Sequence, residues 1–138
     1  MIRTGTMHKL ALLFAMILFM TGCLTIRPES KAKLDEAQVY GLPNDKVQRA
    51  DQTTAGLLNI LPGIGNIYVA VKSEHQKALN WILFPVNLLT WPLSIAWGIP
   101  QAAKDAGRIN QQATADYYMN DKTGQAEFAA AKDAFQKK

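Results

Sequence analysis

The chain is poor in the residues on which most enzyme active sites and disulfide frameworks depend. It has one cysteine and two histidines among its 138 residues. One cysteine cannot form an intramolecular disulfide, which excludes a fold held together by such bonds. His8 falls within a basic leader, so His75 stands alone and has no cysteine partner to complete a metal site. We therefore expect no metal, no cofactor and no enzymatic activity.

Charged residues are also scarce, at 19% of the chain against the roughly 25% usual in soluble domains. The 49% hydrophobic content excludes a disordered chain, and the length allows one small domain. The net charge of +4 is modest, and no basic stripe carries interleaved aromatic residues, so a nucleic acid partner is not expected. Gly63-Ile64-Gly65 lacks the third glycine and the lysine of a phosphate-binding loop. No small-molecule substrate is indicated.

The first residues have the pattern of a cleavable signal. Residues 10–20 form an uninterrupted apolar run behind a basic leader, and this pattern holds whether translation starts at Met1 or at Met7. A run of this length is typical of a signal peptide, because a membrane-spanning helix needs about 20 apolar residues. We expect residues 1–22 to be removed.

The tetrapeptide Met20-Thr21-Gly22-Cys23 resembles the lipobox of bacterial lipoproteins, although leucine is more usual at the first position. The resemblance implies that Cys23 becomes the first residue and carries acyl chains that anchor it in membrane lipid. Leu24 replaces the aspartate that tends to retain such lipoproteins in the inner membrane, which implies an outer-membrane protein facing the periplasm. The inner membrane is the alternative, because a lipoprotein with two true membrane spans should be difficult to carry across the periplasm.

Two long segments, residues 52–71 and 78–103, contain no charged side chain, and a short charged connection separates them. As helices they would be about 30 and about 39 Å long, enough to cross a hydrocarbon core of ~30 Å. The sequence therefore predicts an all-α protein with an apolar helical hairpin. Prolines should kink these helices, since each removes a backbone donor: Pro62, Pro85, Pro92 and Pro100.

Shorter polar helices are expected on both sides of this hairpin. One should cover residues 30–40, another should begin at Asn44, and a last one should cover residues 125–135. The expected organisation is a signal peptide, a tether with short polar helices, the apolar hairpin, and an alanine-rich helical tail, occupying residues 1–22, 23–51, 52–103 and 104–138.

Small and amide-bearing residues recur at helical spacing within the two apolar segments. In residues 52–71 they alternate at intervals of four and three, and in residues 78–103 they recur every seven positions, so each set lies on one helical face. Such faces suit helix–helix contact in lipid, where small residues allow close approach and amides hydrogen-bond. We predict that the two faces pack together through Gly56, Asn59, Gly63, Asn66, Asn80, Asn87 and Ser94.

Two other arrangements would place the same faces toward water. They are a pair of helices lying on a membrane surface and a small soluble bundle. A water-facing stripe of this length would normally carry charged side chains, and these stripes carry none. The composition therefore favours the membrane-inserted arrangement.

Residues 61–68, followed by a tryptophan-rich apolar stretch, resemble the TM2-type membrane hairpin. The chain departs from that family before Tyr68, where the family has His-Arg-Phe, and late in the second helix, where the family has an acid. The resemblance implies a helical hairpin and no chemistry.

These patterns predict a lipid-anchored protein of the bacterial cell envelope with a structural or accessory role. Its partners would be membrane lipid and either an envelope protein complex or further copies of itself. Two alternatives remain open: a protein that perturbs or remodels a bilayer, and a soluble periplasmic binding module held by a lipid tether.

Overall fold

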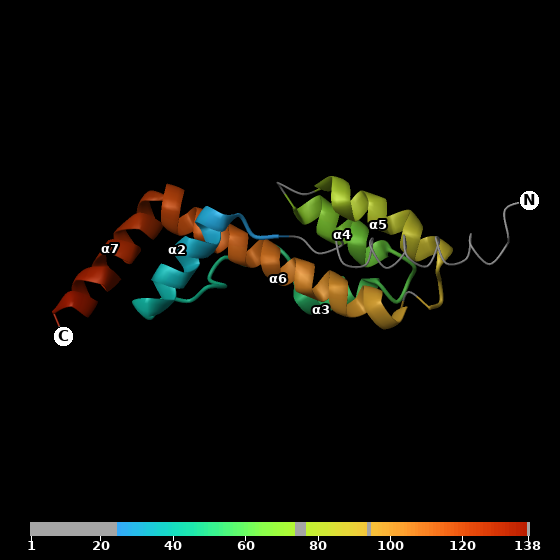
Figure 1. Cartoon of the computed structure of the whole chain (residues 1–138), viewed down its shortest axis with the longest axis horizontal. Helices are drawn as coiled ribbons and strands as arrows, with labels where there is room; N and C mark the ends of the chain where they lie inside the picture. Colours follow the sequence, from blue (N-terminus) through green and yellow to red (C-terminus); the bar gives the residue numbers. More distant parts are fainter. Residues whose placement is uncertain (1–24, 74–76, 94, 138) are drawn as a thin grey trace, which may run out of the picture.

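The computed structural model describes residues 25–73, 77–93 and 95–137. Every regular element in these ranges is a helix, so the prediction of an all-α protein is confirmed (Figure 1). The helices are α2 (Pro28–Val39), α3 (Gln52–Leu58), α4 (Ile64–Lys72), α5 (Lys77–Leu89), α6 (Ile95–Asn120) and α7 (Lys122–Gln136). The predicted signal peptide, Cys23, Leu24, His75 and Ser94 lie outside the described residues.

The apolar segment 52–71 is not one helix, as the sequence suggested, but two. α3 ends at Leu58 and α4 begins at Ile64, with Pro62 and Gly63 in the turn between them. Gly63 has a φ of 77°, a left-handed conformation that residues with a Cβ avoid. This turn reverses the chain, so Pro62 and Gly63 mark a complete break between two helices and not the expected kink within one.

The second apolar segment is also broken. α5 ends at Leu89, the Trp91-Pro92 peptide bond that follows is cis, and α6 begins at Ile95. Pro85 and Pro100 behave differently, because they lie inside α5 and α6, which continue through them. None of the helices in the described ranges combines the length and the apolar character needed to cross a membrane.

α6 is the longest helix and organises the rest. It passes through the predicted boundary between hairpin and tail at residue 103 and continues to Asn120. α3 and α4 pack along its first half, α5 packs on α4, and α2 and α7 pack on its second half (Figure 1). The molecule therefore has an apolar half, formed by α3, α4, α5 and the start of α6, and a polar half, formed by α2, residues 41–51, the end of α6 and α7.

Each half has its own small core. The core of the apolar half extends into the polar half through Ala50 and Ile109. It contains mainly alanine and β-branched side chains: Ala50, Ala55, Val69, Ala102, Ala106 and Ile109. In the polar half it is aromatic: Tyr118 and Phe128 pack around Ala37. Tyr118 is 1% exposed, whereas its neighbour Tyr117 is only partly buried.

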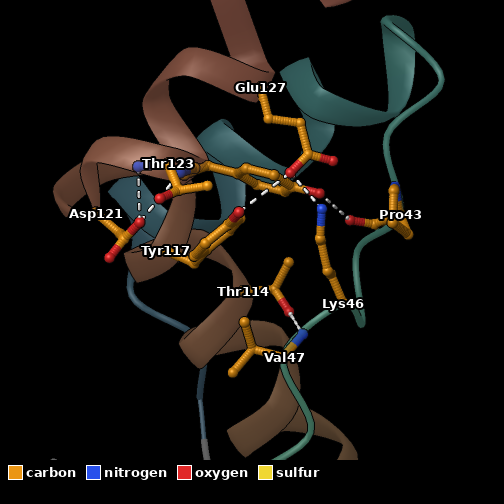
Figure 2. Close-up of polar contacts among 10 residues, drawn as sticks. Pro43, Lys46, Val47, Thr114, Tyr117, Asp121, Thr123 and Glu127 are labelled. Atoms are coloured by element: carbon orange, nitrogen blue, oxygen red, sulfur yellow. Dashed lines mark hydrogen bonds and ion pairs between the residues drawn. The ribbon is translucent and has the colours of Figure 1, made fainter.

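The polar helices at the two ends agree with the sequence. α2 covers the predicted helix 30–40 except for Tyr40, and α7 covers the predicted helix 125–135. Asp121 begins α7 by accepting hydrogen bonds from the N–H groups of Thr123 and Gly124 (Figure 2). Both helices begin earlier than expected, at Pro28 in place of residue 30 and at Lys122 in place of residue 125.

The helix expected from Asn44 does not form, and residues 41–51 run along α6 as an extended connection. Side chains of α6 accept hydrogen bonds from backbone N–H groups of this connection. Val47 donates to Thr114 Oγ1 at 2.9 Å, and Arg49 and Ala50 both donate to Asn110 Oδ1. Tertiary hydrogen bonds have replaced the local ones here.

Candidate functional site

Amide side chains occupy the interior of the apolar half. Asn59 at the end of α3, Asn66 on α4, and Asn80 and Asn87 on α5 are each no more than 3% exposed. Gly56 and Gly63 are buried as well, so all the described members of the predicted packing set lie inside the protein.

The two predicted faces meet at the beginning of α6. A Cβ on Gly98 would lie 2.5 Å from Asn59 Nδ2 and 3.7 Å from Asn87 Nδ2, so a side chain at position 98 would collide with the Asn59 amide. The Trp97 indole N–H donates to Asn87 Oδ1 at 3.2 Å and joins α5 to α6. Sequence reasoning missed Gly98, although it lies four residues after Ser94 and continues the same helical spacing.

Several buried amide atoms in this interior have no hydrogen-bond partner among the described residues. They are Asn59 Oδ1, Asn66 Nδ2 and both amide atoms of Asn80. An unsatisfied buried polar group disfavours folding by about 1–3 kcal/mol. The interior of the apolar half is therefore more polar than that of an ordinary water-soluble domain.

The exterior of the same half shows the opposite composition. Every exposed large apolar side chain in the described ranges, apart from Val39 and Phe135, belongs to residues 57–93. We call this set the apolar surface: Leu57, Ile60, Leu61, Ile64, Val71, Trp81, Ile82, Leu88, Leu89, Trp91 and Leu93. Leu89 is 84% exposed and Leu93 is 73% exposed. Within residues 57–93, eleven large apolar side chains are thus exposed. Large exposed apolar patches are uncommon on soluble monomers and mark interaction sites.

In the sequence, charged residues flank the segments that carry this surface. Lys72 ends α4, Lys77 begins α5, and Lys104 lies on α6. Lys72 and Lys104 are exposed. The nearest acid beyond Lys104 is Asp105, which is 1% exposed and lies 3.5 Å from the guanidinium of Arg108. One exposed acid, Asp51, begins α3, so the described border carries more basic than acidic residues but is not purely basic.

The polar half holds a compact cluster of ionisable groups (Figure 2). Lys46 forms an ion pair with Glu127, and the Tyr117 hydroxyl donates to Glu127 Oε2 at 3.2 Å. The hydrogen bond from Lys46 lowers the pKa of Glu127, and the same bond raises the pKa of Lys46. Burial is the main cause that raises the pKa of Tyr117.

This cluster ties the connection 41–51 to α6 and α7. Lys46 reaches α7 through Glu127, and Tyr118 donates a hydrogen bond to the carbonyl of Pro43 at 3.1 Å. These contacts hold the connection 41–51 against the end of α6 and against α7. Within residues 25–73, 77–93 and 95–137, no group of three His, Cys, Asp or Glu side chains is placed to hold a metal ion.

The apolar surface is accordingly the strongest candidate for a functional site. The sequence indicated it through two uncharged segments, but it did not show that the amides face inward and the large apolar side chains outward. Comparison with protein-family models, with curated proteins and with solved structures finds no match to this chain.

Proposed function

We propose that the chain is a lipid-anchored protein of the bacterial cell envelope with a structural or accessory role. In this proposal, acyl chains on Cys23 and the apolar surface together hold it at a membrane. The observation that carries the proposal is the inverted distribution of polarity in the apolar half, where amides are buried and leucine, isoleucine and tryptophan are exposed.

This arrangement of buried amides and exposed apolar side chains is unfavourable in water and favourable in contact with lipid. Each square ångström of apolar surface left in water forgoes about 25 cal/mol of burial free energy. In hydrocarbon the same surface is already solvated, and buried amides and close-packed glycines become the groups that hold helices together. The Gly98 contact with Asn59 has this character.

Attachment without the lipid tests the proposal. Residues 24–138 are exported behind a conventional cleavable signal, so that Cys23 is absent, and membranes are washed with alkaline carbonate. We expect the protein to remain in the pellet and to float with lipid in a density gradient, which separates membrane binding from aggregation. Release into the supernatant would reject the apolar surface as a membrane element and favour a tethered soluble binding module.

The Cys23→Ala variant of the whole chain is not a substitute for this experiment. Without the lipidated cysteine the predicted signal peptide would not be cleaved, and its apolar run at residues 10–20 would itself hold the protein in the membrane. The exported chain removes both anchors together.

A remodelling role is the second candidate, favoured by the shortness of the apolar helices. α3 has 7 residues and α4 has 9, so they displace lipid only to a limited depth. Such a protein should release dye from liposomes when added at high loading. If the vesicles stay intact under those conditions, the remodelling role is excluded and the structural or accessory role remains.

A further inference from the structure

We infer that the apolar half enters a single leaflet end first, with residues 88–93 deepest and Lys72 and Lys104 at anionic phospholipid headgroups. This inference rests on the membrane association proposed above and adds a depth, an orientation and a lipid class to it.

The most apolar connections lie together at one end of the molecule. The turn between α3 and α4 contacts α5, because a Cβ on Gly63 would lie 2.7 Å from Phe84 Cδ2. The connection from α5 to α6 lies at the same end, where Asn87 and Trp97 are hydrogen-bonded. We call this the apolar end. It lies opposite α7 along the long axis of the molecule (Figure 1).

The distance from the apolar end to the first described charges corresponds to one leaflet. From Ile64 to Lys72, α4 rises about 12 Å, and from Ile95 to Lys104, α6 rises about 14 Å. Half of a hydrocarbon core of ~30 Å is about 15 Å. Deeper insertion would carry Lys72 and Lys104 into hydrocarbon, where charged side chains are strongly disfavoured.

The charges near Lys72 and Lys104 determine which lipid headgroup is favoured at that depth. Lys72 and Lys104 are exposed, and α5 starts with Lys77. The sequence places one acid, Glu74, between Lys72 and Lys77, which leaves an excess of positive charge. An anionic phospholipid headgroup complements it.

The predicted lipid anchor reaches the same level. Arg27 is fixed to α6, because its backbone N–H donates to Gln112 Oε1 at 3.1 Å. Gln112 is about 12 Å beyond Lys104 along the helix. The chain from Cys23 to Arg27 spans at most about 14 Å when extended. An acylated Cys23 can therefore lie in the headgroup layer when Lys104 does, and one leaflet holds both attachments.

Tryptophan depth tests the inference. The mature lipidated chain is reconstituted into phosphatidylethanolamine–phosphatidylglycerol vesicles whose acyl chains carry bromine either near the headgroup or near the chain end. Two matched variants keep a single tryptophan: W81F/W97F keeps Trp91 at the apolar end, and W91F/W97F keeps Trp81, four residues from the start of α5. Circular dichroism verifies that both variants remain helical.

We expect deep bromines to quench Trp91 at least twofold more than shallow bromines, and we expect the opposite order for Trp81. Stronger quenching of Trp91 by shallow bromines, or by iodide in the water, would overturn the inference. That result would place the apolar end at an interface or against another protein copy. Flotation of unlipidated residues 24–138 separates the two proposals: failure to float rejects membrane association itself.

Charge reversal tests the headgroup assignment. In unlipidated residues 24–138, K72E/K104E should weaken binding to phosphatidylglycerol vesicles at least tenfold and leave binding to neutral phosphatidylcholine unchanged. The control K31E/K122E reverses two exposed lysines of the polar half and should have less than a threefold effect. Equal losses in the two variants, or no loss in K72E/K104E, would overturn the assignment.

Discussion

The side chain of Asn110 pairs with the main chain of Ala50 through both of its amide atoms. Its Oδ1 accepts from the Ala50 N–H at 2.9 Å, and its Nδ2 donates to the Ala50 carbonyl at 2.8 Å. Both residues are buried, and Oδ1 also accepts from the Arg49 N–H at 2.8 Å. The Asn110 side chain thus satisfies three backbone groups of the connection before α3, as the backbone of a neighbouring strand would.

Asn110→Ala should therefore lower the free energy of unfolding by about 2–4 kcal/mol, because buried backbone groups lose their partners. Chemical unfolding followed by circular dichroism measures the loss. Asn120→Ala, an exposed position at the end of the same helix, should change stability by less than about 0.5 kcal/mol. Similar losses in the two variants would contradict the role of Asn110.

Gly63 and Gly41 allow backbone strain to be separated from steric collision. Their φ angles are nearly equal, at 77° and 78°, but only Gly63 faces a neighbour, Phe84. Gly41→Ala should cost about 1–2 kcal/mol from left-handed strain alone. Gly63→Ala should cost at least about 1 kcal/mol more, because the new methyl group must displace α5. Equal costs would mean that α5 moves away freely.

The buried asparagines of α5 should respond in opposite directions to leucine. Neither amide atom of Asn80 has a hydrogen-bond partner among the described residues, so Asn80→Leu should raise stability by about 1–2 kcal/mol. Asn87 accepts from the Trp97 indole, so Asn87→Leu should lower stability by a similar amount. Unfolding curves in mild detergent measure both, and a loss in Asn80→Leu would show that this amide has a partner.

The ion pair between Lys46 and Glu127 should give stability a defined pH dependence. The pKa of Glu127 is lowered, chiefly by the hydrogen bond from Lys46, so its contribution is present above the ordinary carboxylate pKa of 4.5. It is lost as the pH falls through the folded-state pKa. The pKa of Lys46 is raised, so its contribution is present below 10.5 and is lost as the pH rises through the folded value.

Glu127→Gln should flatten the profile of unfolding free energy at both ends. Lys46→Gln should flatten the acid end less than Glu127→Gln, because Tyr117 still donates a hydrogen bond to Glu127. The double variant should add nothing beyond Glu127→Gln, because Lys46 acts through Glu127. Additive changes in the double variant would show that the two side chains act independently.

A charge at the apolar end should release the protein from membranes without unfolding it. Leu89 is 84% exposed, so Leu89→Lys leaves the core unchanged, whereas a lysine deep in hydrocarbon costs about 2.5–3.5 kcal/mol. In residues 24–138 without Cys23, we expect roughly a hundredfold lower partitioning into vesicles. Val39→Lys, an exposed site of the polar half, should partition normally. Equal partitioning of the two variants would exclude residue 89 from the membrane.

Helix content and the outer helices were predictable because they depend on local signals. Asp121 caps α7, and the alanine-rich composition of α7 needs no distant partner. The breaks in the apolar helices were harder to predict. Pro62 and Pro85 look equivalent in the sequence, yet the chain turns beside Pro62 and continues through Pro85. The difference is Gly63, whose left-handed conformation requires the missing Cβ and a close fit against Phe84.

The candidate site was likewise predictable only in part. The spacing of Asn59, Asn66, Asn80 and Asn87 placed them on helical faces, and the structure places all four inside the protein. The apolar surface could not be located from the sequence, because the orientation of each face depends on which helices pack together. Nor could residues 41–51 be assigned, since their backbone N–H groups donate to Thr114 and Asn110, which lie 60 or more residues away in the sequence.

α6 belongs to both halves of the molecule, and this has a mechanical consequence. It is one helix from Ile95 to Asn120, about 39 Å long, with α3 fixed to its first half and α2 and α7 to its second. A displacement of α2 or α7 would therefore be carried along α6 to the helices of the apolar half. Pro100 removes one backbone hydrogen bond near the start of α6, so bending is easiest there.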